Sequence, residues 1–178
     1  PLERLMLRLD VIGIRRASHL IATSRHTRKD LVEYLGVPAG KVSVVYNGAD
    51  HDIFRPRADL PRNGRFVLYV GSERPRKNLR RLFEAFSRLK REFPDLKLVK
   101  VGPVGRSGAY RQETLRHLHE LGITGDVHFV DYLPEQELAR YYATAALLAY
   151  PSLYEGFGLP PLEAMSSGCP VVSSSSSS

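Results

Sequence analysis

From Phe66 onward, short apolar runs alternate with longer stretches in which apolar residues recur every three or four positions. Short apolar runs bounded by turn residues are typical of buried strands, and the longer spacing is typical of amphipathic helices. The pattern predicts strands at 66–70, 96–101, 127–130, 146–150 and 170–172, with helices at 79–93, 110–121, 135–143 and 161–167 between them. Strict alternation predicts an α/β fold, with a Rossmann-like parallel sheet and helices on both faces. The buried face of the first helix should consist of Leu79, Leu82, Phe83, Phe86 and Phe93.

The first fifty residues carry a shorter version of this pattern. They predict an amphipathic helix at 2–12, a strand at 19–23, a helix at 25–35 capped by Ser24, and a strand at 42–46. A stretch rich in Pro, Asp, Asn and Arg follows and shows no periodicity, so it reads as a linker. The expected organisation is therefore residues 1–50 as one domain end, 51–64 as linker, 65–172 as the Rossmann-like domain, and 173–178 as a serine tail without function.

Composition places the chain among ordinary globular proteins. Of its 178 residues, 43% are hydrophobic and 25% charged, and Cys169 is the one cysteine. A single cysteine forms no internal disulfide, and no Cys/His cluster has metal-ligand spacing, so we expect a cytoplasmic protein without a metal. The net charge of +7 fits several anionic partners, including the inner face of a membrane, and peripheral association there stays open.

The first loop that carries candidate chemistry runs from Gly71 to Asn78. Parallel sheets bind ligands at the carboxyl ends of their strands. Five cations crowd the start of the following helix, namely Arg74, Arg76, Lys77, Arg80 and Arg81. The helix dipole disfavours cations there by about 0.3–1 kcal/mol each, unless an anion such as a diphosphate binds. Lys77 is the strongest candidate, whereas each arginine also reads as a solvated surface charge.

The second loop, at 154–165, reads Tyr-Glu-Gly-Phe-Gly-Leu-Pro-Pro-Leu-Glu-Ala-Met. Its two glycines let the backbone approach a ligand closely, and a proline suits the first turn of a helix. Glu155 and Glu163 stand eight positions apart, which lets both carboxylates face one cleft and accept hydrogen bonds from sugar hydroxyls. The simpler alternatives are an exposed loop acid for Glu155 and, for Glu163, an acid in the first helical turn that the dipole stabilises.

These two loops resemble those of a known family. The run from Glu155 to Glu163, with Pro-Arg-Lys-Asn at 75–78 upstream, is similar to the retaining GT-B glycosyltransferases of family 4 (glycosyl transferases group 1), which include bacterial mannosyl- and rhamnosyltransferases. The resemblance covers about 17–172. It implies the end of an N-terminal acceptor domain at 1–50, followed by a donor nucleotide-sugar-binding domain that is the C-terminal half of a GT-B fold. We expect that half to be incomplete, because the family pattern continues past Val172. The resemblance also implies that the catalytic histidine of the family lies in the acceptor domain.

The resemblance also implies roles for individual residues. Lys77 and Glu155 would be catalytic, with Lys77 on the donor diphosphate and Glu155 on the hydroxyls of the donor sugar, while Glu163 would bind the ribose. The other implied donor-binding residues are Gly71, Ser72, Arg76, Gly102, Val130, Leu133, Gly156, Phe157, Gly158 and Leu159. Many members carry Arg where this chain has Ser72.

The implied reaction transfers a hexose from a nucleoside-diphosphate sugar, GDP-mannose or another, to a glycan or lipid-linked acceptor with retention. It would serve cell-surface polysaccharide synthesis and need no metal or further cofactor, and we expect the isolated chain to be inactive. Two alternatives stay open. A glycoside hydrolase using Glu155 and Glu163 would release sugar from simple glycosides without nucleotide, and a non-catalytic module would only bind nucleotide. No nucleic-acid partner is expected, because the cations gather without aromatic residues for base stacking.

Overall fold

The computed structural model describes residues 10–60, 65–105 and 108–177. The chain forms two compact units. Of the described residues, the first unit contains 10–48, 155–158 and 177, and the second contains 49–60, 65–105, 108–154 and 159–176.

The second unit is built on one five-stranded sheet. Its strands are β3 (Phe66–Val70), β4 (Lys97–Val101), β5 (Val127–Val130), β6 (Leu147–Tyr150) and β7 (Val171–Ser173). They lie in the order β5-β4-β3-β6-β7, and every neighbouring pair is parallel. The predicted parallel α/β fold is confirmed. The chain order reverses between β3 and β6, and such a switch point is where open parallel sheets bind ligands.

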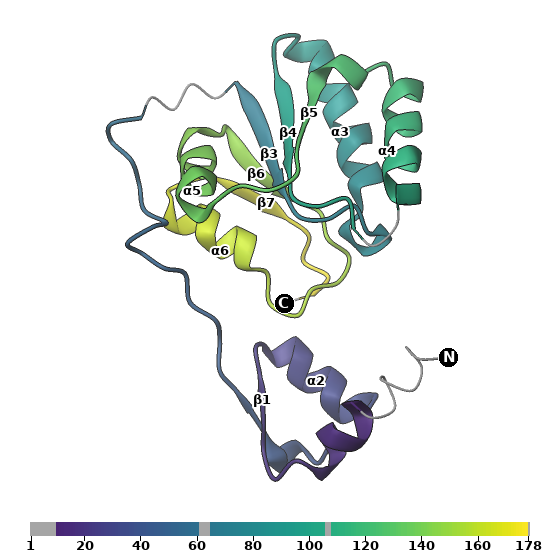
Figure 1. Cartoon of the computed structure of the whole chain (residues 1–178), viewed down its shortest axis with the longest axis vertical. Helices are drawn as coiled ribbons and strands as arrows, with labels where there is room; N and C mark the ends of the chain where they lie inside the picture. Colours follow the sequence, from purple (N-terminus) through teal and green to yellow (C-terminus); the bar gives the residue numbers. More distant parts are fainter. Residues whose placement is uncertain (1–9, 61–64, 106–107, 178) are drawn as a thin grey trace. The chain divides into compact units, whose positions relative to one another are not determined.

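Helices cover both faces of this sheet. Helices α3 (Leu79–Glu92) and α4 (Gly108–Glu120) lie on one face, and α5 (Glu135–Thr144) and α6 (Leu159–Ser166) lie on the other (Figure 1). Two 3₁₀ turns, η2 (Pro75–Lys77) and η3 (Thr124–Asp126), precede α3 and β5. Right-handed crossovers explain this arrangement. The connections from β3 through β4 to β5 move in one direction across the sheet, and those from β5 through β6 to β7 move in the other, so their helices lie on opposite faces.

Each face of the sheet has its own apolar core. Leu79, Leu82, Phe83 and Phe86 of α3 are buried against one face, as predicted. The prediction was wrong for Phe93, whose side chain is 56% exposed. Phe93 is the C-cap residue, with φ −124° and ψ 75°, so its backbone has left the helix and its side chain no longer follows the buried stripe.

The last strand continues into the serine run. Ser173 pairs with Tyr150 in the β6–β7 ladder, and the backbone amide of Ser174 donates to the carbonyl of Tyr150 at 3.2 Å. The Ser176 hydroxyl donates to the carbonyl of Leu153 at 3.2 Å. The expected end of the sheet at Val172 was therefore one residue early, because a ladder depends on backbone groups and continues while its partner strand does.

The first unit contains β1 (Leu20–Ala22), α2 (Arg25–Glu33), η1 (Ala39–Lys41) and β2 (Val42–Val44), with β1 and β2 parallel. Ser24 caps α2 as predicted, since its hydroxyl accepts from the Thr27 amide at 3.0 Å. Residues 10–16 are helical, while the expected helix over 2–9 falls on residues that are not described. Within the described ranges, no helix combines the length and the apolar character needed to cross a membrane.

Candidate functional site

Two glycines bring the ends of β3 and β4 close together. The Gly71 amide donates to the Val101 carbonyl and the Gly102 amide donates to the Val130 carbonyl, each at 2.8 Å. Gly102 has φ +120°, and a Cβ on it would lie 2.8 Å from the Gly71 carbonyl oxygen. Only glycine fits that backbone without strain. The loops after β3, β4 and β5 are thereby joined side by side at one edge of the sheet, where two predicted donor-binding residues meet.

Lys77 lies at the end of η2, just before α3. Its side chain is only 8% exposed, so it is not a solvated surface charge. Its Nζ lies 3.4 Å from the Tyr150 hydroxyl and 5.2 Å from the centroid of the Tyr150 ring. Tyr150 ends β6, the strand beside β3, so an ammonium is held where the sheet reverses its order.

Three contacts join this turn to the loop after β6. The Leu153 amide donates to the Arg76 carbonyl at 2.8 Å, and the Arg76 guanidinium donates to the Tyr154 carbonyl at 2.8 Å. The Asn78 side-chain amide donates to the Pro151 carbonyl at 3.1 Å. Asn78 is left-handed, with φ 56°, and its side chain makes no capping bond to α3. The two candidate loops are therefore connected at 76–78 and 151–154.

Glu163 lies on α6, on the opposite face of the sheet from α3. Because α6 begins at Leu159, two residues earlier than predicted, Glu163 is its fifth residue and lies beyond the first turn. The expectation of an acid in the first helical turn was wrong. One carboxylate oxygen, Oε2, accepts from the Tyr142 hydroxyl at 2.9 Å. Burial raises the pKa of Glu163, the charge of Glu135 raises it further, and the Tyr142 hydrogen bond lowers it.

The remaining candidates are distributed over both units. The Ser72 carbonyl accepts from the Tyr69 hydroxyl at 3.0 Å, which fixes the loop after Gly71. Val130 and Leu133 are half-buried against the core beneath α5 and α6. Leu159 begins α6. The last four candidates belong to the first unit: Glu155, Gly156, Phe157 and Gly158. Glu155 is buried.

The same edge of the sheet carries a buried charge network that was not predicted from the sequence. Lys100 of β4 is fully buried, and its Nζ lies 3.3 Å from Oε1 of Glu73. The same ammonium donates to the carbonyls of Gly102 and Pro103. Arg111 of α4 donates to Oε1 of Glu73 through Nε at 2.8 Å. The available signal was a lysine between Val99 and Val101 in a strand expected to be buried on both faces.

The electrostatics of this network follow from its burial. Burial lowers the pKa of Lys100, while the negative charge of Glu73 opposes that shift. The hydrogen bond that the Arg111 guanidinium donates to Glu73 raises the pKa of Arg111. The network joins Glu73 in the loop after β3 to β4 and α4, so it fixes the loops after β3 and β4, which carry the predicted donor-binding residues Gly71 and Gly102.

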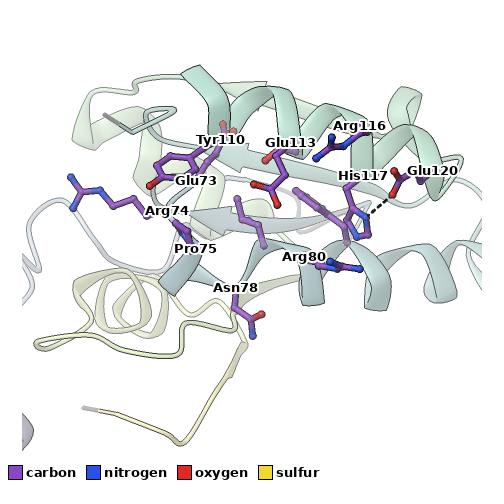
Figure 2. Close-up of a pocket in the computed structure, with 13 residues that line it drawn as sticks. Glu73, Arg74, Pro75, Asn78, Arg80, Tyr110, Glu113, Arg116, His117 and Glu120 are labelled. Carbon is purple, nitrogen blue, oxygen red and sulfur yellow. Dashed lines mark hydrogen bonds and ion pairs between the residues drawn. The ribbon is translucent and has the colours of Figure 1, made fainter. Parts of the chain in front are cut away.

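A cavity of about 550 Å³ lies between α3 and α4, and residues 73–75 and 78 of the first candidate loop contribute to its lining (Figure 2). No predicted donor-binding residue lines it. Its lining mixes charges of both signs, with the acids Glu73, Glu113 and Glu120 among the cations Arg74, Arg80 and Arg116. Nδ1 of His117 lies 3.5 Å from Oε2 of Glu120. In the part of the chain that the structure describes, no group of three or more His, Cys, Asp or Glu residues could hold a metal ion.

Comparison with known families decides the classification. The model of the glycosyl transferases group 1 family matches residues 50–178, and that of glycosyltransferase family 4 matches 1–53. The chain belongs to the group 1 glycosyltransferases. The MMP alpha-(1->4)-mannosyltransferase of Mycolicibacterium hassiacum is 35% identical over 90% of this chain and 38% of its own length. The O-antigen chain mannosyltransferase B of Escherichia coli is 33% identical over 89% of this chain and 43% of its own length. The chain thus spans about two-fifths of the curated relatives it matches.

Solved structures confirm that this group 1 glycosyltransferase has a GT-B-type fold. Sucrose-phosphate synthase from Thermosynechococcus elongatus superposes with a TM-score of 0.81 at 30% identity, over 97% of this chain and 44% of that one. Anabaena HepE, solved in complex with UDP-glucose, gives a TM-score of 0.83 at 24% identity, over 96% of this chain and 49% of that one. At that identity, HepE supports the fold alone.

Proposed function

We propose that this chain forms the donor-binding half of a retaining hexosyltransferase. The enzyme takes a hexose from a nucleoside-diphosphate sugar and transfers it to a glycan or lipid-linked acceptor, without a metal. The observation that carries the proposal is the buried ammonium of Lys77, which ends η2 beside Tyr150 where the strand order reverses. A buried cation in this position is stabilised by a bound anion, and a diphosphate supplies one.

In the proposed reaction, Lys77 stabilises the negative charge that grows on the diphosphate as the bond between sugar and phosphate breaks. A fixed donor aimed at developing charge acts mainly by electrostatics, because it needs no reorganisation during the reaction. The contacts of Arg76 and Asn78 with the loop after β6 hold Lys77 in place. Glu155 accepts hydrogen bonds from the hydroxyls of the donor sugar, and Glu163 accepts them from the ribose.

The names of the relatives favour a mannose-type donor and a cell-surface product. Two of them are mannosyltransferases, and one of these carries the name of an O-antigen enzyme. Six others are D-inositol 3-phosphate glycosyltransferases at 31–34% identity. We therefore infer a GDP-mannose-like donor first and another hexose donor second, used in polysaccharide synthesis on the cytoplasmic side of a membrane.

The donor site is tested by titrating the 178-residue chain with GDP, UDP and dTDP in a calorimeter. We expect one of them to bind, and we expect Lys77→Ala to weaken it about 10- to 100-fold, because hydrogen bonds to charged groups contribute about 1.5–3 kcal/mol. The matched control is Arg80→Ala, three positions after Lys77 and near the start of α3, where the arginine is largely exposed and paired with Glu84. It should change affinity less than twofold.

Turnover provides the second readout. In a protein that carries this chain together with an acceptor domain, Lys77→Ala should lower turnover roughly 100-fold or more. Equal nucleotide affinity and equal turnover in the wild type and Lys77→Ala would remove Lys77 from the mechanism. Sugar release from simple glycosides without nucleotide would instead favour a hydrolase.

A further inference from the structure

Tyr142 of α5 forms a hydrogen bond with Glu163 of α6. Its hydroxyl donates to Oε2 of Glu163 at 2.9 Å, from one helix to its neighbour on the same face of the sheet. Tyr142 is fully buried. A buried phenol needs a hydrogen-bond partner, so the contact alone is also compatible with a purely structural role.

The tyrosine ring is held on several sides. The Phe54 ring meets it edge-on, with centroids 5.9 Å apart, and Leu148 and Ala164 belong to the same buried cluster. Burial raises the pKa of Tyr142 far above neutrality, and the charge of Glu163 raises it further. The phenol therefore keeps its proton and acts as a donor with one fixed direction.

The Glu163 carboxylate lies in a setting that disfavours its charge. Burial and the nearby Glu135 both raise its pKa, and the Tyr142 hydroxyl is the group that lowers it. A carboxylate has two oxygens with about four acceptor sites. With Oε2 bonded to Tyr142, the structure shows no protein donor to Oε1 among the residues it describes.

We propose that Tyr142 is a positioning residue: its hydroxyl fixes the Glu163 carboxylate so that the free oxygen accepts a hydroxyl of the donor ribose. The inference rests on the proposed function and deepens it. Through Glu163, Tyr142 makes the site distinguish a ribonucleotide from a deoxyribonucleotide. Phe54, from the segment before the sheet, supports the ring in turn.

The test compares a ribonucleoside diphosphate with its 2′-deoxy and 3′-deoxy analogues. Each is titrated into the 178-residue chain, starting from whichever of GDP and UDP binds more tightly. We expect the wild type to prefer the ribonucleotide over at least one analogue by about tenfold, the equivalent of one charged hydrogen bond. Glu163→Gln and Tyr142→Phe should each reduce that preference to about twofold or less. The double variant should lose little more, because two residues acting through one contact are not additive.

The control is Tyr141→Phe, on the same helix. Tyr141 is half-buried with its ring against Phe66, so the change removes a neighbouring phenol oxygen without touching Glu163. It should keep the wild-type preference. Glu163→Asp is a second variant, which draws the carboxylate back from an intact Tyr142 and should also lose the preference.

The possible results distinguish the proposed donor-binding function from the proposed positioning role of Tyr142. If the wild type binds no nucleotide, the proposed function fails and this inference fails with it. If Glu163→Gln loses the preference while folded Tyr142→Phe keeps it, Tyr142 is a structural residue only and the inference is overturned. If both variants keep the preference, the assignment of Glu163 to the ribose fails while nucleotide binding stands.

Discussion

The ammonium of Lys100 lies 3.3 Å from a carboxylate oxygen of Glu73, and both side chains are completely buried. Arg111 approaches the same oxygen from α4 at 2.7 Å. One carboxylate therefore balances two cations at the edge of the sheet where the candidate loops gather. Removing the shared anion should therefore lower the free energy of unfolding more than removing one of the two cations.

Glu73→Gln should destabilise the protein by about 3–5 kcal/mol, because it leaves Lys100 and Arg111 facing each other without a buried counter-charge. Lys100→Met should cost less, since Glu73 keeps Arg111 and the carbonyls that Lys100 released, Gly102 and Pro103, lie near the surface. Urea unfolding followed by circular dichroism measures both.

Glu84→Gln is the surface control for this comparison. Glu84 pairs with exposed arginines on α3, and pairs of that kind contribute less than about 1 kcal/mol. A Lys100→Met protein less stable than Glu73→Gln would show that the carbonyl contacts, and not the shared anion, dominate the network.

The approach of Gly102 to Gly71 gives a second prediction. Gly102→Ala places a methyl 2.8 Å from the Gly71 carbonyl oxygen at φ +120°, so one of the two loops must move. We expect a loss of about 1–3 kcal/mol, which is roughly 2–4 °C in midpoint per kcal/mol for a chain of this size. Nucleotide affinity should fall as well. Gly125→Ala, where a Cβ meets nothing within 4 Å, should leave both unchanged, and equal midpoints for the two variants would contradict the close approach.

The sequence predicted the elements well where hydrophobic period decides the structure. All five strands and four helices of the second unit form, because alternation of buried runs and amphipathic stretches constrains a parallel sheet strongly. The prediction that Phe93 is buried was wrong, because hydrophobic periodicity does not reveal the backbone angles at the end of a helix. The start of α6 was wrong for the same reason, and this moved Glu163 out of the first turn.

The candidate loops were found from residue types, but their contacts were not. The sequence indicated an anion site at Lys77, but it did not indicate that the side chain of Asn78 donates to Pro151, 73 positions away. The ion pair of Glu73 and Lys100 joins the loop after β3 to β4, and no local sequence pattern relates these two residues. Such contacts depend on strand order, and a single sequence does not reveal that β3 lies beside both β4 and β6.

Asn78 separates the effect of backbone angle from that of a side-chain contact. Asn78→Ala loses the bond to Pro151 and also places an ordinary residue at φ 56°, where a Cβ costs about 1–2 kcal/mol. Asn78→Gly loses only the bond, which contributes about 0.5–1.5 kcal/mol. Alanine should therefore be the less stable variant by thermal melting. If glycine and alanine melt together, the left-handed conformation is not a constraint on this junction.

Asp126 gives a prediction for low pH at the opposite edge of the sheet from the candidate site. One of its oxygens accepts from Lys97 at 2.6 Å and from Lys90 at 2.9 Å, and the hydrogen bond from Lys97 lowers its pKa. A carboxyl whose pKa is lowered by folding stabilises the protein above its unfolded value, near 4, and loses that contribution as the pH falls through the folded value. The wild type should therefore be more stable than Asp126→Asn at neutral pH, by up to about 1 kcal/mol. The difference should shrink below about pH 4.

Melting curves at pH 7, 5, 4 and 3 measure this difference in stability, with the exposed Asp95→Asn as control. A difference that stays constant down to pH 3 would show that the lysines do not hold the Asp126 charge, and nucleotide affinity at pH 7 should be the same in all three proteins.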